Sequence, residues 1–242
     1  MTVAGERELG LEWHPDAVRP PFEWTMALPS DWTVVDTHPA SWKRRTERII
    51  DDVFAGKRLT SAQRRDVRGY LAGVVAGSQK ARILLTLVKF GVDESEIPEA
   101  VGLTVRWASN APRMASLATV RKGLSGASET EEFTGANGAR MILRRERRSQ
   151  LSGGKTEKVT HLQGFMPAAG TQWTLVVTMS TTRTDLDETL DTLLRRIIGS
   201  VKVLGDQAAT ADSAVADPAT SGSSGADGGS ESFSVTRFEA PE

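Results

Sequence analysis

Histidine and carboxylate side chains are the groups of this sequence that could hold a metal or transfer protons. The chain has three histidines, His14, His38 and His161, and Asp36 lies two residues before His38. A protein metal site needs at least three converging ligands, and one Asp–His pair supplies two. His161 lies in a segment with strand-like alternation, where a hydrogen-bonded or exposed histidine is more common than a ligand. We therefore expect no metal site.

Acidic residues stand next to one another at three places in the chain. They are Asp51–Asp52, Asp93–Glu94 with Glu96, and Glu131–Glu132. Acid–base catalysis needs carboxylates that converge across a cleft and differ in pKa. Neighbours on one element point in different directions, so we interpret these residues as solvated charge.

Motifs for nucleophilic catalysis and phosphate binding are missing or incomplete. There is no cysteine, which excludes a Cys nucleophile, a disulfide and a zinc–thiolate site. There is also no Gly-x-Ser-x-Gly nucleophile motif. Residues 152–156 contain Gly-Lys-Thr, but Ser149 stands where the phosphate-binding pattern needs a glycine, and two strands flank the segment in place of a following helix. We expect no cofactor and no enzymatic activity.

One predicted strand, residues 139–149, is crowded with five arginines, which are Arg140, Arg144, Arg145, Arg147 and Arg148. The two-residue period of a strand puts Arg145 and Arg147 on one face and Arg144 and Arg148 on the other. A strand charged on both faces must lie at a sheet edge or project past the helices, where charge prevents unwanted strand pairing. We favour this edge protection, and an anionic partner is the alternative interpretation.

Charge is distributed unevenly along the 242 residues. Residues 206–242 carry seven acidic residues and one basic residue, which leaves 29 basic and 24 acidic residues in 1–205. Nucleic-acid binding calls for a strongly basic domain with exposed stacking aromatics. The body of this chain is only mildly basic, and its Trp and Phe residues fall at core-facing positions. We expect no nucleic-acid partner.

The sequence also bears on the cellular location. The first residues lack the basic start and apolar run of a secretory signal. The most apolar stretch, residues 81–90, is about half as long as a membrane-spanning helix, and Arg82 and Lys89 interrupt it. We expect a cytoplasmic protein without membrane insertion.

The chain divides into an N-terminal extension (1–21), one globular domain (22–205) and a tail (206–242). The tail is rich in Ala, Ser, Gly and Asp, so it cannot bury enough apolar surface to offset its ordering entropy, and we expect it to be disordered. Its end is different, because Phe233, Val235 and Phe238 reappear there. Such a motif can dock as a strand on a partner or on the edge of the chain's own sheet. Its alternative is a frayed apolar end.

Hydrophobic periodicity gives the elements of the domain. Alternation predicts strands near 22–28, 103–107, 139–149, 158–166 and 173–179, and an apolar run predicts another at 81–90. Helical spacing predicts helices near 42–53, 60–77, 113–124 and 186–201, with Thr184 and Asp187 as a capping box for the last. Strands with one apolar face need cover. The predicted fold class is α+β, with a central antiparallel sheet of about six strands, flanking helices and a C-terminal helix packed on the sheet.

This order of elements resembles the PsbP-like fold family across residues 22–204. The residues that carry the resemblance are Leu28-Pro29-x-x-Trp32, which ends the first strand, and the strand 173–180, which leads into the closing helix 186–198. The resemblance implies a small α+β domain in an accessory, adaptor or chaperone protein, a group that includes chaperones for secreted bacterial effectors. It implies no catalytic residue.

Two functional hypotheses follow for this chain. The first is a non-catalytic protein-interaction module, an adaptor or chaperone-like accessory factor, with Arg144, Arg145, Arg147, Arg148, Phe233, Val235 and Phe238 as candidate interaction residues. The second is a ligand-binding or enzymatic domain with a pocket between sheet and helix, lined by Trp24, Trp32, Trp42 and Tyr70. These aromatics would otherwise fill a core, which is the more common arrangement. The partner and the oligomeric state do not follow from the sequence.

Overall fold

The computed structural model describes residues 14–56, 59–91, 99–124, 129–152, 155–204 and 233–238. Its largest element is a seven-stranded sheet in which all neighbouring strands are antiparallel. Its strands, in spatial order, are β2 (Thr33–Val34), β3 (Leu85–Gly91), β4 (Glu99–Ser109), β8 (Trp173–Thr181), β7 (Lys155–Pro167), β6 (Arg140–Ser152) and β5 (Glu129–Thr134). The predicted α+β class with a central antiparallel sheet is confirmed, with seven strands in place of about six.

A second sheet of three strands lies behind the first. Its order is β10 (Phe233–Phe238), β1 (Glu23–Pro29) and β9 (Lys202–Leu204). The alternation in β1 buries Trp24, Met26 and Leu28 in the main core, each at most 3% exposed. β1 is therefore fixed to the body by its own side chains.

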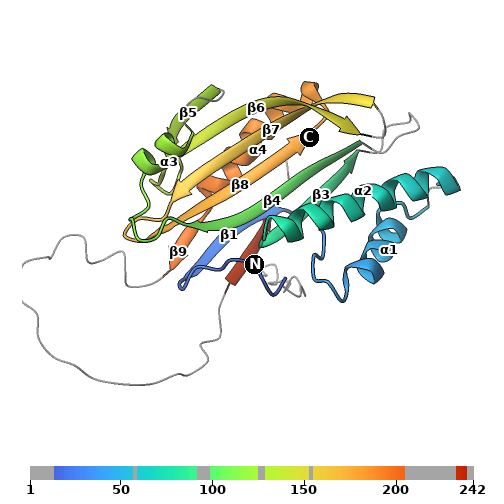
Figure 1. Ribbon diagram of the computed structural model, residues 1–242, viewed down its shortest axis with the longest axis horizontal. Coiled ribbons are helices and arrows are strands. Elements are labelled where there is room, and N and C mark those ends of the chain that lie inside the picture. Colours follow the sequence, from blue (N-terminus) through green and yellow to red (C-terminus); the bar gives the residue numbers. More distant parts are fainter. Residues whose placement is uncertain are drawn as a thin grey trace, which may run out of the picture.

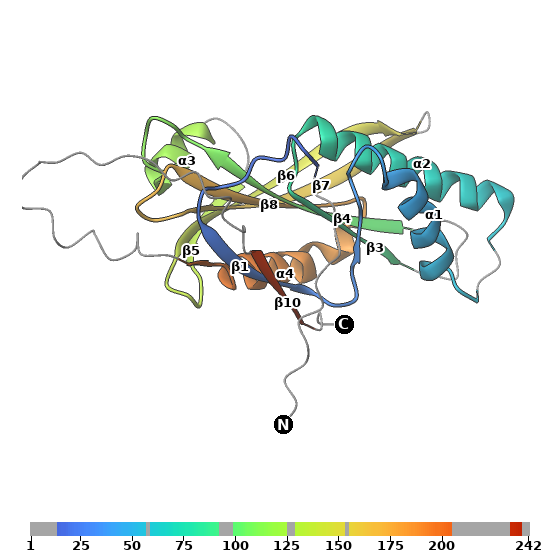
Figure 2. The ribbon, with the colours of Figure 1, turned by 90° about the horizontal axis from the view of Figure 1, so that it is seen from below.

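The helix α4 (Asp187–Gly199) covers the same face of the large sheet as β1 (Figures 1 and 2). Its apolar stripe is Leu190, Leu193, Leu194, Ile197 and Ile198, all buried, and at about 1.5–3 kcal/mol for each side chain this burial is a major stabilising contribution. α4 can approach β7 this closely only because a glycine, Gly164, lies at the point of contact. A Cβ on Gly164 would lie 2.3 Å from Ile198 Cδ1.

Three further helices lie on the opposite face, at its two ends (Figure 2). α1 (Trp42–Val53) and α2 (Ser61–Lys80) pack as a pair on β3, and α3 (Leu117–Gly123) lies near β6 and β7. α2 begins with the capping box that its sequence favours, because Thr60 Oγ1 accepts a hydrogen bond from the Gln63 amide and the Gln63 side chain accepts one from Thr60. Within the described part of the chain, no helix lies over the middle of this face, between α2 and α3.

Several local predictions can be compared with the structure. Asn137-Gly138, a pair that favours tight hairpin turns, lies in the turn between β5 and β6, with Gly138 at a φ of 77°. The capping box at Thr184 is wrong, because residues 184–186 form a 3-10 turn and Leu186 is the N-cap of α4. The strand predicted at 81–90 begins at Leu85, since Arg82 adopts a turn with a φ of 52°. The predicted disorder of 206–232 and most of the N-terminal extension lie outside the described residues.

Candidate functional site

The apolar motif near the C-terminus lies at the edge of β1. β10 pairs with β1 in parallel over six residue pairs, from Trp24 with Phe233 to Pro29 with Phe238, and Val235 is paired with Met26. The other edge of β1 pairs with β9 in antiparallel fashion. The structure thus joins the two ends of the sequence through main-chain pairing, and it places the predicted docking residues on the chain's own sheet edge.

The four candidate interaction arginines of β6 divide between the two faces of the sheet, as the alternation predicts. On the α4 side, Arg147 Nη2 lies 2.8 Å from Asp187 Oδ2 and Arg145 Nη2 lies 3.5 Å from Asp191 Oδ1. On the opposite face, Arg144 and Arg148 both contact the Glu146 carboxylate, at 2.7 and 2.5 Å. β6 pairs with β5 only over residues 140–145, so the described ladder gives Arg147 and Arg148 a partner strand on one side, in β7.

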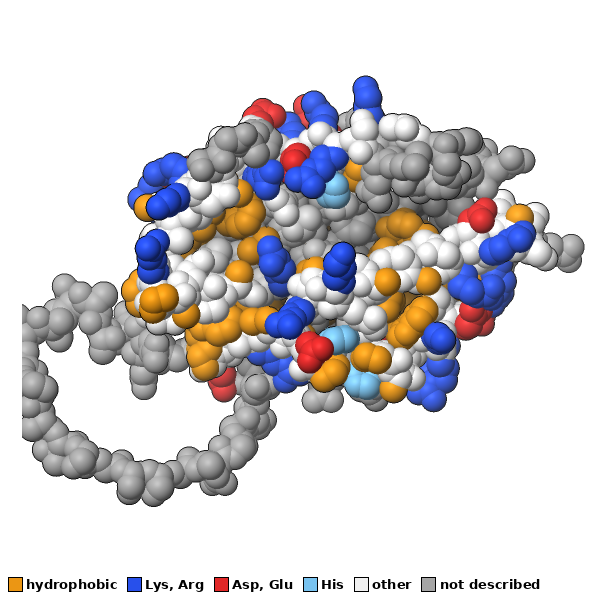
Figure 3. All heavy atoms as spheres, viewed as in Figure 1, with side chains coloured by type: hydrophobic (Ala, Val, Ile, Leu, Met, Phe, Trp, Pro, Cys, Tyr) orange, Lys and Arg blue, Asp and Glu red, His pale blue; other side chains and the backbone are white. Residues whose placement is uncertain are grey.

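The uncovered face of the sheet carries a hydrogen-bonded polar network. His161 Nδ1 and Ser180 Oγ share a hydrogen bond of 2.8 Å, and Gln163 Nε2 donates to Thr178 Oγ1 at 3.2 Å. All four side chains are half-buried. Figure 3 views the molecule from this side and shows Lys and Arg side chains, in blue, scattered over a face that is otherwise largely white, the colour of the backbone and of side chains that are neither hydrophobic nor charged.

Ser180, His161 and Glu146 lie in one row on β8, β7 and β6. The row resembles a Ser–His–acid triad in residue types, but the described hydrogen bonds of Glu146 come from Arg144 and Arg148. Burial, with added repulsion from Arg148, lowers the pKa of His161 below its ordinary 6.5. The arrangement is a neutral histidine beside a carboxylate that two arginines hold, and it binds polar groups more readily than it activates Ser180.

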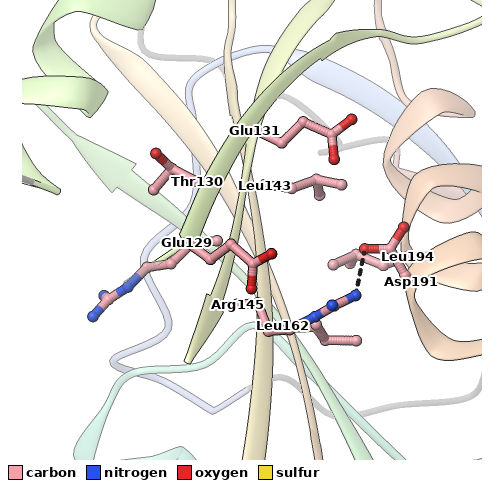
Figure 4. Close-up of a pocket in the computed structure, with 9 residues that line it drawn as sticks. Glu129, Thr130, Glu131, Leu143, Arg145, Leu162, Asp191 and Leu194 are labelled. Carbon is pink, nitrogen blue, oxygen red and sulfur yellow. Dashed lines mark ion pairs between the residues drawn. The ribbon is translucent and has the colours of Figure 1, made fainter. Parts of the chain in front are cut away.

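A pocket of about 280 Å³ lies on the other side of the sheet, between β5, β6, β7 and α4 (Figure 4). Its apolar floor consists of Leu143, Leu162 and Leu194, all buried. Its polar walls include the carboxylates of Glu129, Glu131 and Asp191 and the guanidinium of Arg145. In Figure 4 the β5 and α4 carboxylates surround the leucines, and Arg145 reaches across to Asp191. The pocket therefore combines an apolar base with an acidic rim.

Arg195 of α4 ties the rim of this pocket together. Its guanidinium lies 2.7 Å from Glu131 Oε2, 2.6 Å from Asp191 Oδ2 and 4.9 Å from the centre of the Phe133 ring. The hydrogen bond from Arg195 lowers the pKa of Glu131 below its ordinary value. Glu131 is therefore ionised at neutral pH, and Arg195 holds both Glu131 and Asp191 in place.

The aromatic residues proposed to line a pocket belong to two separate clusters. Trp24 and Trp32 are buried in the main core, where the Trp24 ring lies 5.3 Å from Trp107. Trp42 packs against the cluster formed by α1, α2 and β3, and Tyr70 contacts Phe90 of that cluster with ring centres 6.1 Å apart. The sheet separates the two pairs, so these four residues do not line one pocket.

Sequence reasoning missed the acidic pocket. Glu129, Glu131 and Phe133 alternate, which is a signal for one face of a strand, but the pairing partner of that strand could not be read from the sequence. Asp191 and Arg195 lie four residues apart on α4, the spacing of a helical ion pair. Their convergence with β5 depends on the strand order β7-β6-β5.

Two searches of the described residues bear on metal and membrane binding. Within those residues, no three His, Asp or Glu side chains are grouped closely enough to hold a metal ion. In the same part of the chain, none of the helices has the length and apolar composition to cross a membrane.

Comparisons with known proteins give distant structural likeness only. No protein-family model matches the sequence, and no curated protein matches it either. The PsbP-like resemblance thus stays a prediction. Among solved structures, the chain is similar to LpqN, described as involved in cell envelope biogenesis of Mycobacterium tuberculosis, with 12% sequence identity and a TM-score of 0.36 over 77% of this chain and 87% of that chain. A likeness this distant carries no argument about function.

Proposed function

We propose that this chain is a non-catalytic protein-interaction module, an adaptor or chaperone-like accessory factor, that binds an extended segment of a partner protein along β1. The observation that carries the proposal is the parallel pairing of β10 with β1. β10 follows β9 only after residues 205–232, so it reaches β1 as a remote segment of the chain. In this account β10 is an internal occupant of a strand-accepting edge.

The packing of β1 is compatible with the replacement of β10 by a partner segment. Its buried face, with Trp24, Met26 and Leu28 all in the core, holds the strand in place whether or not its outer edge is occupied. Main-chain hydrogen bonds supply the affinity in strand addition, and side-chain pockets supply the specificity. A partner segment can therefore replace β10 without rebuilding the core.

The state of the ionisable groups supports the non-catalytic part of the proposal. The arginines of β6 are held by carboxylates of the chain itself. Glu146, the acid nearest His161 in the sheet, is bound by arginines. The described lining of the acidic pocket contains no histidine, serine or lysine. These groups form ion pairs, and the described lining of this pocket places no nucleophile beside a base.

A peptide in trans tests the proposal. A fluorescent peptide of residues 231–242 is titrated into the full chain and into a chain that ends at Leu204, with binding followed by polarisation. The shortened chain should bind saturably. The full chain should bind at least about tenfold more weakly, because β10 belongs to the same chain as β1 and competes at an effective concentration on the order of millimolar.

The matched control is the same peptide with Val235→Pro and Thr236→Pro. Adjacent strand residues direct their amides to opposite sides, so one of the two prolines must remove a donor facing β1. This peptide should not bind. Equal binding of the native peptide to both chains, or binding of the proline peptide, would contradict the proposal. In host extract, the shortened chain should retain more of any partner that uses this edge.

A further inference from the structure

The outer edge of β5 is a second place where a strand can be added. β5 ends the spatial order of the seven-stranded sheet, and within the described residues its ladder is with β6 alone. Five of its six residues are exposed, and Phe133 is half-buried. A sheet edge presents a row of main-chain donors and acceptors to any extended segment.

The acidic pocket opens directly beside this edge. Glu129 and Glu131 are two residues apart on β5 and lie on the face turned toward α4, opposite Arg145 and Leu143 of β6. A strand added to β5 would direct every second side chain to that same face. Such a side chain would reach the rim formed by Glu129, Glu131 and Asp191 (Figure 4).

The charges of the pocket favour a cation. Its lining includes three carboxylates and two arginines, Arg144 and Arg145, and these arginines are paired with the carboxylates of Glu146 and Asp191. Asp191 and Glu131 are joined to Arg195, whereas Glu129 makes no ion pair within 4 Å among the described contacts and interacts with Arg147 only at longer range. Glu129, on the strand that forms the open edge, is therefore the carboxylate of the pocket that a further cation can approach.

We propose that this pocket receives a lysine or arginine side chain from an extended partner segment that pairs along β5. Such a side chain has an apolar stem and a charged end, which match the leucine floor and the carboxylate rim. The pocket volume of about 280 Å³ lies just below the usual range of about 300–1,000 Å³ for drug-sized ligands, and is large enough for one such side chain. The proposal is independent of the strand at β1.

Phe133 adds a second requirement for the partner. It follows Glu131 by two residues on the same face of β5 and lies under the Arg195 guanidinium. A strand added to β5 could place a basic residue opposite Glu129 and an apolar residue opposite Phe133 at the same time. The sequence that fits is thus an extended segment with a basic residue and an apolar residue four positions apart.

The test uses synthetic peptides and the full chain. The probe is a seven-residue peptide. Threonine stands at its odd positions, and its even positions carry lysine, lysine and valine in that order. One matched peptide carries norleucine at both lysine positions, which keeps the stem and removes the charge, and another is N-methylated at alternate amides. Calorimetry gives the affinity of each peptide, and methyl NMR of Leu143, Leu162 and Leu194 shows whether it binds at the pocket.

The lysine peptide should bind and shift these methyl signals. The norleucine peptide should bind about 2- to 5-fold more weakly, and the N-methylated peptide should not bind.

Two variants of β5 complete the test. Glu129→Gln should weaken the lysine peptide by about 2- to 5-fold, because it removes the carboxylate that has no ion pair. Glu132→Gln lies on the same strand and the opposite face, where Arg121 and Arg140 contact it, and should leave the affinity unchanged. Equal affinity of lysine and norleucine peptides, no effect of Glu129→Gln, or an equal effect of Glu132→Gln would overturn the proposal. None of these outcomes bears on binding at β1.

Discussion

At the residue scale, two ion pairs fix α4 on the sheet. Arg145 and Arg147 are two strand residues apart, about 6.6 Å, and their partners Asp191 and Asp187 are one helical turn apart, about 6.0 Å. The match in spacing lets both pairs form at once, with α4 running antiparallel to β6. The arginines that the sequence marks as a charged cluster therefore act as a clamp between strand and helix.

Replacing Arg147 should destabilise the protein more than replacing its neighbour Arg148, because the two side chains lie on opposite faces of β6. Arg147 and Arg148 are equally exposed, at 60% and 62%, but the Asp187 side chain is only 10% exposed and its Oδ1 has no partner. Arg147→Met leaves that carboxylate buried and unpaired, and should reduce the free energy of unfolding by about 1–2 kcal/mol. Arg148→Met leaves Glu146 with Arg144 and should cost less than about 0.5 kcal/mol. Urea unfolding of both variants gives the comparison, and equal losses would contradict the clamp.

His161 should make stability depend on pH. Burial lowers the pKa of the folded histidine below 6.5, so the folded state binds its proton less readily than the unfolded chain. The stabilising effect is complete above pH 6.5 and is lost as the pH falls below that value. An NMR titration should place the His161 midpoint below that of the same residue in urea. A midpoint at or above the urea value would show that burial does not control this side chain.

At the element scale, the regular periods of the sequence predict most of the fold. The stripes of α1, α2 and α4 and the alternation of β1 and β8 correspond to buried faces. The three-residue strand β9 is too short to show a period. The start of α4 was misplaced because Thr184 has a cap-like sequence, although the helix begins three residues later after a 3-10 turn.

The contact between α4 and β7 depends on one small residue. Gly164→Ala places a methyl 2.3 Å from Ile198 Cδ1 and 3.4 Å from Leu143 Cδ2, so the helix or these side chains must move. We expect a loss of about 1–3 kcal/mol in the free energy of unfolding. Gly69→Ala, on α2, has nothing within 4 Å and should add about 0.5–1 kcal/mol through helix propensity. Thermal unfolding measures the stability of both variants. A Gly164→Ala chain more stable than the original would contradict the close packing of α4 on β7.

At the scale of the whole molecule, what sequence reasoning missed is long-range pairing. The acidic pocket needs β5 beside β6 and α4 across from both, and none of these adjacencies follows from local periodicity. The same holds for the pairing of β10 with β1, where residues from the two ends of the chain meet. The sequence predicted an apolar docking motif at 233–238, but not which edge it would meet.

The two proposed strand-accepting edges, at β1 and at β5, differ in charge. β1 and β10 belong to a small sheet whose core side is apolar, and β5 presents three glutamates at the far end of the large sheet. A partner with alternating apolar residues suits the first edge, and a partner with basic residues suits the second. The uncovered polar face, with its lysines and arginines, lies between α2 and α3 on the other side of the large sheet (Figure 3).

Amide hydrogen exchange along β1 tests the strand-accepting edge most directly. The full chain and the chain that ends at Leu204 are compared at residues 23–29, with the α4 amides, residues 187–199, as internal reference. Losing β10 should accelerate exchange at alternate β1 amides, leave α4 unchanged, and be reversed by the peptide of residues 231–242. Identical exchange along β1 in the two chains would show that β10 does not occupy this edge, and the proposed mode of binding would fail with it.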